Sequence, residues 1–449
     1  MNESQRGSLL AASLGLTLVL LDVSVVNVAL DALLHQFSTD VAGLQWVVNG
    51  YTLCFAAFLL TGGMLGDRFG VRKIFSYGVS IFSLASLGCG LASTLEVLIA
   101  SRIAQGIGAA LLVPSSLGML QLAFPDIDQR SRAVGWWAAI GGLSMAAGPV
   151  LGGLLVSHTG WRSIFLINLP FGLLALYLTY RYVKHGYGHI HGNLDWPGQI
   201  AVILALVCFT VALTEAGRIG LAHVFTISAL MLAMVFGIAF LWIQASSKAP
   251  MLPLILFRTP TLVAASVAGV IVNFSYYGLI FVFSLFFQVQ QHFSAQQTGF
   301  AFLPMTLILV VMNILAGRLV RRVGKRNLMT TGFLIAASGY SLLLSVDVDG
   351  DYSDLVIPML LAASGMALIV PTMVNAALCS VPPSHAGVAS GLLNTARQVG
   401  GIIGVAAFGF LVSDTQTDAF MQGMHLSLCL SVMSLIFGAV ISWRWIERR

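Results

Sequence analysis

The sequence predicts an all-α protein that crosses a membrane many times, and three observations lead to this prediction. Hydrophobic residues make up 58% of the 449 residues and charged residues only 9%, whereas an average soluble domain carries about 25% charged residues. Apolar stretches long enough to span a bilayer recur along the whole chain. Basic residues gather in alternate loops between these stretches. The solvent for most of this chain is therefore expected to be lipid.

Fourteen apolar segments are each long enough to cross a bilayer as a helix. They do not alternate between apolar and polar residues as barrel strands do, so helices are expected throughout. The segments are 8–30, 44–64, 75–94, 97–118, 134–156, 163–182, 197–214, 222–243, 260–285, 298–319, 328–346, 355–377, 387–412 and 424–443.

The distribution of Lys and Arg predicts the orientation of the chain in the membrane. Of the 22 basic residues, Arg102 and Arg397 lie inside segments, and Arg162 and Arg218 lie in loops on one side. The other 18 lie on the opposite side, which is the pattern of the positive-inside rule. Both termini are therefore expected in the cytoplasm, which requires an even number of spans.

The chain also repeats itself. Residues 63–72 (GMLGDRFGVR) and 317–326 (GRLVRRVGKR) share Gly, Leu, Arg, Gly and Arg at the same spacing, and residues 110–114 (ALLVP) resemble residues 367–371 (ALIVP). Eight segments separate the members of each pair. The sequence therefore predicts two six-helix halves, 1–183 and 259–449, with two extra helices and their linkers in 184–258, an arrangement known in transporters.

Enzyme chemistry, metal binding and cofactors are not expected. The five cysteines show no CxxC spacing, and no GxxxxGK[ST] motif for binding nucleotide phosphates is present. The histidines at 185, 189 and 191 lack further ligands for a metal site. The net charge of +5 is explained by the cytoplasmic loops and does not indicate a nucleic-acid partner.

Asp22 is the acidic residue that lies clearly inside a segment, and such residues usually carry function. It is a candidate proton carrier, and the alternative is a structural carboxylate bonded to a neighbouring helix. Arg102 and Gln105 share a helical face with small residues, which indicates either a functional partner for the acid or a helix-tying arginine.

A second polar face in the segment 387–412 contains Asn394 and Arg397 among small residues. The glycines of this face are expected to serve helix packing, and the role of Arg397 is left open. Asn273, Tyr276 and Tyr277 share a face of the segment 260–285, where aromatic residues either line a substrate pocket or pack against lipid and helices.

The segment 134–156 carries Gly148, Pro149, Gly152 and Gly153, which predict a close helix contact and a bend, and a tight seam that seals one state against leakage. The loop after the segment 44–64 places Asp67 among basic residues. This acid either caps a helix or pairs across the seam between the halves, and ordinary positive-inside charge is the alternative.

Together these motifs resemble the major facilitator superfamily, in particular its fourteen-span drug:proton antiporter branch (EmrB/QacA type). The resemblance covers essentially the whole chain. It rests on LDVSVVNVAL at 21–30, the loop 63–73, RIAQGIGAA at 102–110, GG at 141–142 with GPVLGG at 148–153, GWR at 160–162 with NLPFG at 168–172, and LDWPG at 194–198.

The resemblance implies proton-driven export of lipophilic toxic compounds by alternating access, in a bacterial cytoplasmic (inner) membrane. It implies that Asp22 and Arg102 couple protons to transport, and it suggests a substrate cavity formed by Asn27, Asn49, Gln105, Asn273, Tyr276, Tyr277, Asn394 and Arg397. The residues implied in gating are Gly63, Gly66, Asp67, Arg68, Gly70, Arg72, Gly148, Pro149, Gly152 and Gly153. Because Arg321 replaces the acid in the second copy of the loop, a latch between the halves is expected on one side only.

Members that export dications carry several acids within the membrane, whereas here Asn49 stands at a position that is acidic in some of them. Neutral, zwitterionic or monovalent substrates are therefore expected, chiefly small lipophilic neutral or monocationic compounds, together with protons, for a protein that functions as a monomer. The alternatives are a proton-coupled carrier of one metabolite, a membrane enzyme or lipid-handling protein, and an accessory subunit.

Overall fold

The computed structural model describes residues 1–184, 195–247, 250, 252, 254–348, 350–381 and 386–447. Every regular element within these ranges is helical. Each of the fourteen predicted segments lies on one or more of these helices, so the all-α prediction is confirmed. The three histidines considered as metal ligands lie outside the described residues.

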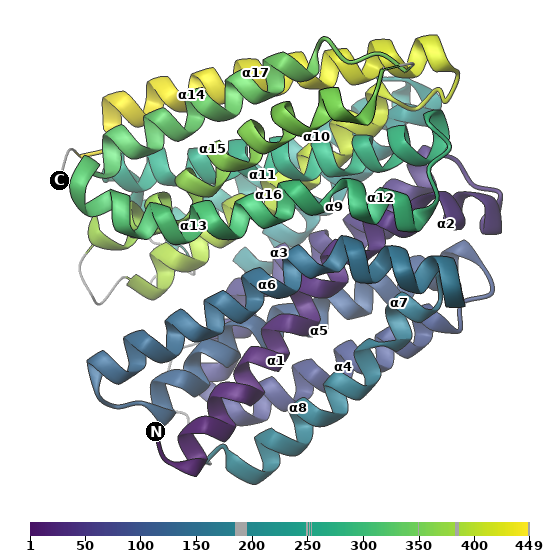
Figure 1. Cartoon of the computed structure of the whole chain (residues 1–449). Coiled ribbons are helices and arrows are strands. Elements are labelled where there is room, and N and C mark those ends of the chain that lie inside the picture. The colour runs from purple at the N-terminus through teal and green to yellow at the C-terminus, as the bar shows by residue number, and fades with distance from the viewer. Residues whose placement is uncertain are drawn as a thin grey trace.

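The elements up to residue 182 form a first bundle, drawn in purple and blue in the lower part of Figure 1. A short 3-10 segment, η1, interrupts the first predicted span. The elements of this bundle are α1 (Glu3–Val25), η1 (Val26–Ala29), α2 (Leu30–Phe37), α3 (Val41–Phe69), α4 (Val71–Gly90), α5 (Leu95–Ala123), α6 (Ile127–Thr159), α7 (Ser163–Leu166) and α8 (Asn168–Tyr182).

Two helices follow, α9 (Trp196–Ile219) and α10 (Val224–Ser246), and then a second bundle that Figure 1 draws above the first in teal, green and yellow. Its elements are η2 (Leu254–Arg258), α11 (Pro260–Leu285), the π-helical turn η3 (Phe286–Gln290), α12 (Ala295–Ala301), α13 (Leu303–Val323), α14 (Lys325–Leu343), α15 (Tyr352–Cys379), α16 (Ala386–Leu411) and α17 (Thr417–Trp445).

The repeated loop has the same backbone in both bundles. Gly70 ends α3 and begins α4 with φ of 92°, and Gly324 ends α13 and begins α14 with φ of 84°. Glycine populates this region without the steric penalty that a Cβ atom imposes. The glycines shared by the two sequence copies therefore make the same sharp turn between consecutive helices.

Eleven helical segments of the described residues are long and apolar enough to span a membrane. The predicted spans on α4, α14 and α16 are not among them. Both α4 and α14 begin with basic residues, and both contain several serine and glycine residues that lower their mean hydropathy. The multi-pass membrane architecture is thus supported, and the full count of fourteen spans stays a prediction.

Both chain termini lie at one end of the molecule, here called the termini end, at the left of Figure 1. At the opposite end, called the far end, one buried cluster joins the two bundles, and it includes Val26 and Trp161 of the first bundle with Phe286 and Phe302 of the second. The first bundle has a separate cluster around Phe75 that contains no residue of the second bundle. The bundles therefore share a hydrophobic core at the far end.

The extra helix α9 is fastened to the first bundle by polar contacts. Gln199 accepts a hydrogen bond from Thr61 and donates one to the carbonyl of Ala57 at 2.7 Å, both on α3. Near the far end, Trp46 of α3 donates to Glu215 of α9 at 3.0 Å. The contact of α9 with the second bundle is apolar, through the cluster that contains Ile402.

An ion pair adds to this fastening at the far end. Arg218 of α9 donates two hydrogen bonds to Asp40, at 2.7 and 2.8 Å. The Arg218 guanidinium holds the pKa of the Asp40 carboxyl below its usual range, because it stabilises the ionised form. Asp40 also caps α3 by accepting from the backbone N–H of Gly43 at 2.9 Å.

Candidate functional site

Asp22 lies near the end of α1, one turn before the helix changes to the 3-10 segment η1, and its side chain is fully buried. Short 3-10 stretches inside longer helices often mark functional positions. Asp22 and Arg102 are the charged residues among the buried polar side chains of the described residues. A buried charge of this kind needs an ionic or hydrogen-bonded partner.

Three side chains of other helices bind the Asp22 carboxylate. Arg102 of α5 forms an ion pair with Oδ2. Gln105 donates to Oδ1 at 2.7 Å, and Asn168 of α8 donates to the same oxygen at 3.1 Å. The structure therefore brings together Asp22, Arg102 and Gln105, which the sequence analysis singled out.

Further contacts hold the Arg102 side chain in place. Its Nε donates to the carbonyl of Val47 at 3.1 Å, and its Nη1 donates to Gln105 Oε1 at 2.7 Å. The guanidinium carbon lies 4.4 Å from the centroid of the Tyr51 ring, a cation–π distance. The pair is thus neutral overall and surrounded by donors, acceptors and an aromatic face.

Ser86 and Asn168 complete this network, and the sequence analysis did not select them as site residues. The Ser86 hydroxyl of α4 accepts from Gln105 at 2.8 Å and from Asn168 at 3.1 Å. Asn168 begins the NLPFG motif at 168–172, and an amide inside a predicted span is a signal by which it could have been identified. Ser86 gave no such signal, because four serines occur in α4.

A second polar group lies in the second bundle. Arg397 of α16 donates from Nε to the side-chain oxygen of Asn273 of α11 at 3.4 Å. The rings of Tyr276 and Tyr277, also on α11, lie 5.4 Å apart edge to face. The structure therefore brings these four predicted cavity residues onto two packed helices, and no hydrogen bond among the described residues joins them to the Asp22 carboxylate.

The remaining cavity candidates join neither group. Asn27 of η1 donates to the carbonyl of Val23 at the end of α1 at 3.0 Å, and Asn394 donates to the carbonyl of Ser390 in its own helix at 3.0 Å. Asn49 is fully buried, and neither its amide nitrogen nor its oxygen has a hydrogen-bond partner in the described part of the chain. An unpartnered buried amide is costly, so Asn49 is open to a further contact.

The glycines of α6 allow two close helix contacts. A Cβ atom at Gly148 would collide with Ser24 of α1, and one at Gly152 would lie 3.1 Å from the carbonyl oxygen of Val25. A Cβ atom at Gly153 would meet the backbone of Ala295 at the start of α12, in the other bundle. Pro149 takes part in the same contact between α6 and α12, because its carbonyl oxygen lies against Gly299 of α12.

A leucine at Gly153 is therefore expected to force α6 and α12 apart at the far end. Overpacking of this kind typically costs about 1–3 kcal/mol, which changes the population of the closed far end by roughly 5- to 150-fold. We expect export to fall at least about tenfold and a cysteine at the buried Thr298 position to label faster with a maleimide.

Gly135→Leu on the same helix is the matched control, because a Cβ atom there meets nothing within 4 Å. It should leave both the transport rate and the labelling rate near wild type. Equal effects of the two substitutions would show that the seam between α6 and α12 has no special role.

The predicted gating loop lies at the termini end, but its residues belong to the end of α3 and the start of α4, and Gly70 alone separates the two helices. Gly63 and Gly66 of α3 lie against Pro114 and Ser115 of α5, where added Cβ atoms would be 3.7 and 3.3 Å from the nearest side-chain atoms. Asp67 is exposed and forms no ion pair with another described residue. In this structure the loop therefore makes no ionic latch between the bundles.

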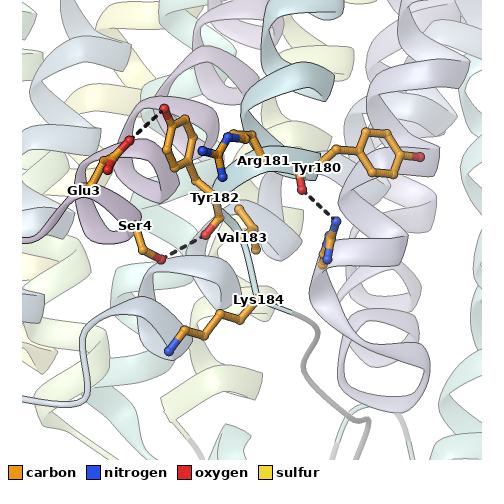
Figure 2. Close-up of a pocket in the computed structure, with 8 residues that line it drawn as sticks. Glu3, Ser4, Tyr180, Arg181, Tyr182, Val183 and Lys184 are labelled. Carbon is orange, nitrogen blue, oxygen red and sulfur yellow. Dashed lines mark hydrogen bonds between the residues drawn. The ribbon is translucent and has the colours of Figure 1, made fainter.

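The basic residues of this loop contact their own bundle. Arg68 lies over the ring of Phe69, at 5.4 Å. Arg72 donates to the backbone carbonyl of Tyr180 at 3.0 Å, and Figure 2 shows this bond at the end of α8. In the same view Tyr182 bonds Glu3 through its hydroxyl at 3.3 Å, which ties α8 to the start of α1.

Residues 12–405 match the profile of the Major Facilitator Superfamily. The chain is 34% identical over 438 residues to the methylenomycin A resistance protein of Streptomyces coelicolor, which covers 98% of this chain and 92% of that protein. It is 37% identical over 414 residues to the multidrug resistance protein Stp of Mycobacterium tuberculosis, covering 92% and 77%.

Among solved structures, a bacterial homologue of the human lysosomal transporter Spinster superposes with a TM-score of 0.71 at 19% identity, over 99% of this chain and 97% of that chain. At this level of identity the superposition supports the fold alone.

Proposed function

The chain belongs to the major facilitator superfamily, and we propose that it exports small toxic compounds in exchange for protons by alternating access. Membership makes it a multi-pass membrane transporter rather than an enzyme, and the resemblance stated from the sequence motifs is confirmed at this level. Its relatives carry names of antibiotic resistance and multidrug resistance proteins, which supports drug export as the transported function.

The buried pair of Asp22 and Arg102 is the observation that supports proton coupling. Protonation of Asp22 would remove its charge and leave Arg102 without an ionic partner in a buried setting. Removing one member of a buried ion pair costs about 3–5 kcal/mol, so the helices around the pair must rearrange when the proton binds. A proton crossing 100 mV releases about 2.3 kcal/mol, plus the contribution of the pH difference.

The proposed cycle assigns roles to the two bundles. Substrate binds between them while the far end is closed, and Asp22 loses its proton to the termini side with the help of Arg102. The bundles then reorient, the seam between α6 and α12 opens, and substrate leaves as Asp22 takes up a proton. The loop with Asp67 is proposed to latch the termini end in that second state.

The topology belongs to the same proposal. We assign fourteen spans, with halves 1–183 and 259–449 and the two extra helices within 184–258. The termini end faces the cytoplasm, because 18 of the basic residues are assigned to that side. A single chain contains both bundles and the whole Asp22 network, so a monomer suffices for the cycle.

The decisive experiment uses purified protein in proteoliposomes with an imposed pH gradient and an internal pH-sensitive dye. We expect several chemically unrelated lipophilic compounds to release protons each time one of them is added. A response to one compound alone would indicate a carrier dedicated to that metabolite. No response to any compound, from protein that is folded by size-exclusion chromatography, would remove the drug-export function.

A further inference from the structure

We propose that the transport site selects lipophilic monoanions, such as carboxylates or phenolates, through the guanidinium of Arg397. This inference rests on the proposed export function and specifies its substrate class. The first observation is that most charged side chains within the spans of the described residues have a partner of opposite charge, as follows. The Asp22 carboxylate is paired with Arg102, and Glu215 lies near Arg218 with their closest charged atoms 3.5 Å apart. Arg397 has no acidic partner among the described residues.

The hydrogen bonding of Arg397 is also incomplete. Arginine carries five N–H donors and no acceptor. The described contacts use one of them, the Nε–H that donates to Asn273 at the long distance of 3.4 Å. The Arg397 side chain is half-buried, and no described residue accepts a hydrogen bond from its terminal nitrogens. The two terminal nitrogens of the guanidinium therefore have donors left for a ligand.

The backbone of α11 leaves room for this side chain. A Cβ atom at Gly269 would lie 2.9 Å from Arg397 Cγ, so the arginine stem crosses α11 at a residue without a side chain. One turn further along α11, Asn273 orients the guanidinium. Gly269 leaves space for the aliphatic part of the Arg397 side chain, and Asn273 binds its guanidinium, so Arg397 lies along the surface of α11.

The position of Arg397 suits a transported ligand. It lies near the middle of α16, the helix of the second bundle that packs on α3 of the first bundle and on α9. Five residues further along α16, Ile402 contacts Leu53 and Ala56 of α3. The helix that carries Arg397 therefore lies at the boundary between the bundles, where alternating access requires the substrate to bind, and the Arg397 side chain itself packs on α11.

The surroundings of Arg397 favour a ligand that is both apolar and anionic. Tyr277 lies beside Gly401, where a Cβ atom would be 3.0 Å from the ring, and Tyr276 packs against Tyr277. Aromatic faces bind apolar rings, and a carboxylate pairs with guanidinium through two parallel hydrogen bonds. A cation at the same place would meet an unneutralised positive charge inside the membrane. The monocationic substrates expected from the sequence are therefore disfavoured.

Three fluorescent compounds that differ in charge test this inference: 4-(1-pyrenyl)butyrate, its methyl ester and 4-(1-pyrenyl)butylamine. Equilibrium binding to the full-length protein in detergent is measured by pyrene fluorescence. We expect the carboxylate to bind about tenfold more tightly than the amine. Arg397→Gln should weaken carboxylate binding about tenfold and leave ester binding unchanged, whereas Arg397→Lys should retain part of the preference for the carboxylate.

Arg318→Gln is the matched control, since Arg318 is an exposed arginine near the end of α13. It should preserve the full charge preference. The inference is overturned if the amine binds the wild type as tightly as the carboxylate, if no compound of the three binds, or if the preference survives in Arg397→Gln.

The binding measurement does not depend on export, so the two proposals fail separately. A protein that prefers the carboxylate but releases no protons in proteoliposomes keeps the anion site and loses the export function. A protein that exports the amine best keeps the export function and loses the anion site.

Discussion

Asp22→Asn should abolish proton-coupled export, with a loss of at least about 100-fold in substrate-induced proton release. Asparagine has the shape of the acid and keeps an oxygen that accepts hydrogen bonds from Gln105 and Asn168. It has no carboxylate to take up or release a proton. The measurement is the pH-dye assay in proteoliposomes, with folding checked by size-exclusion chromatography.

Asp31→Asn provides the control for this experiment. Asp31 lies on α2, in the same part of the chain, but its side chain is partly exposed, and among the described residues its ionic partner is His35 at 3.3 Å. This variant should transport at close to the wild-type rate. If Asp22→Asn retained pH-dependent export of the same compounds, the coupling role of Asp22 would be refuted.

Arg102→Met should destabilise the protein by about 3–5 kcal/mol, because it leaves the Asp22 carboxylate buried without its ionic partner. Methionine fills a similar elongated space beside Tyr51 but supplies no charge and no hydrogen-bond donor. The measurement is the free energy of unfolding in mixed micelles, titrated with a denaturing detergent.

The double variant Asp22→Asn/Arg102→Met measures the interaction energy between the two side chains, separately from their contacts with other residues. Because it leaves no unpaired buried charge, it should be more stable than the sum of the two single effects predicts, by at least about 1.5 kcal/mol. Additive effects would mean that the two side chains contribute independently, and the proposed coupling through their pairing would then be untenable.

The sequence predicted the helices and singled out Asp22 and Arg102, because long apolar runs and charged residues inside them are strong local signals. Long apolar runs identify spans without knowledge of their neighbours, and the repeated loop identified Gly70 and Gly324 as equivalent turns. Charged residues inside apolar runs are rare, so Asp22 and Arg102 can each be identified from the sequence without knowledge of the other. Their direct contact was not predicted from the residues alone, because an arginine that ties helices together gives the same sequence pattern as a partner for the acid.

The contacts between distant segments were not predictable in the same way. Nothing in the sequence near Gly153 indicates that the backbone of Ala295, in the other bundle, lies against it. The hydrogen bonds between Gln199 and α3 likewise involve common polar residues, and their pairing depends on how the helices pack. Ser86 belongs to this class, since serine in a membrane helix usually bonds its own backbone.

The Asp22–Arg102 pair also bears on how the protein is made. The ribosome synthesises Arg102 80 residues after Asp22, and at about 5–20 residues per second this interval lasts roughly 4–16 s. During that time the first span carries a carboxyl group whose ionic partner does not yet exist. The contact proposed to couple transport therefore cannot contribute to the insertion of the first span, and it forms only after α5 has been synthesised.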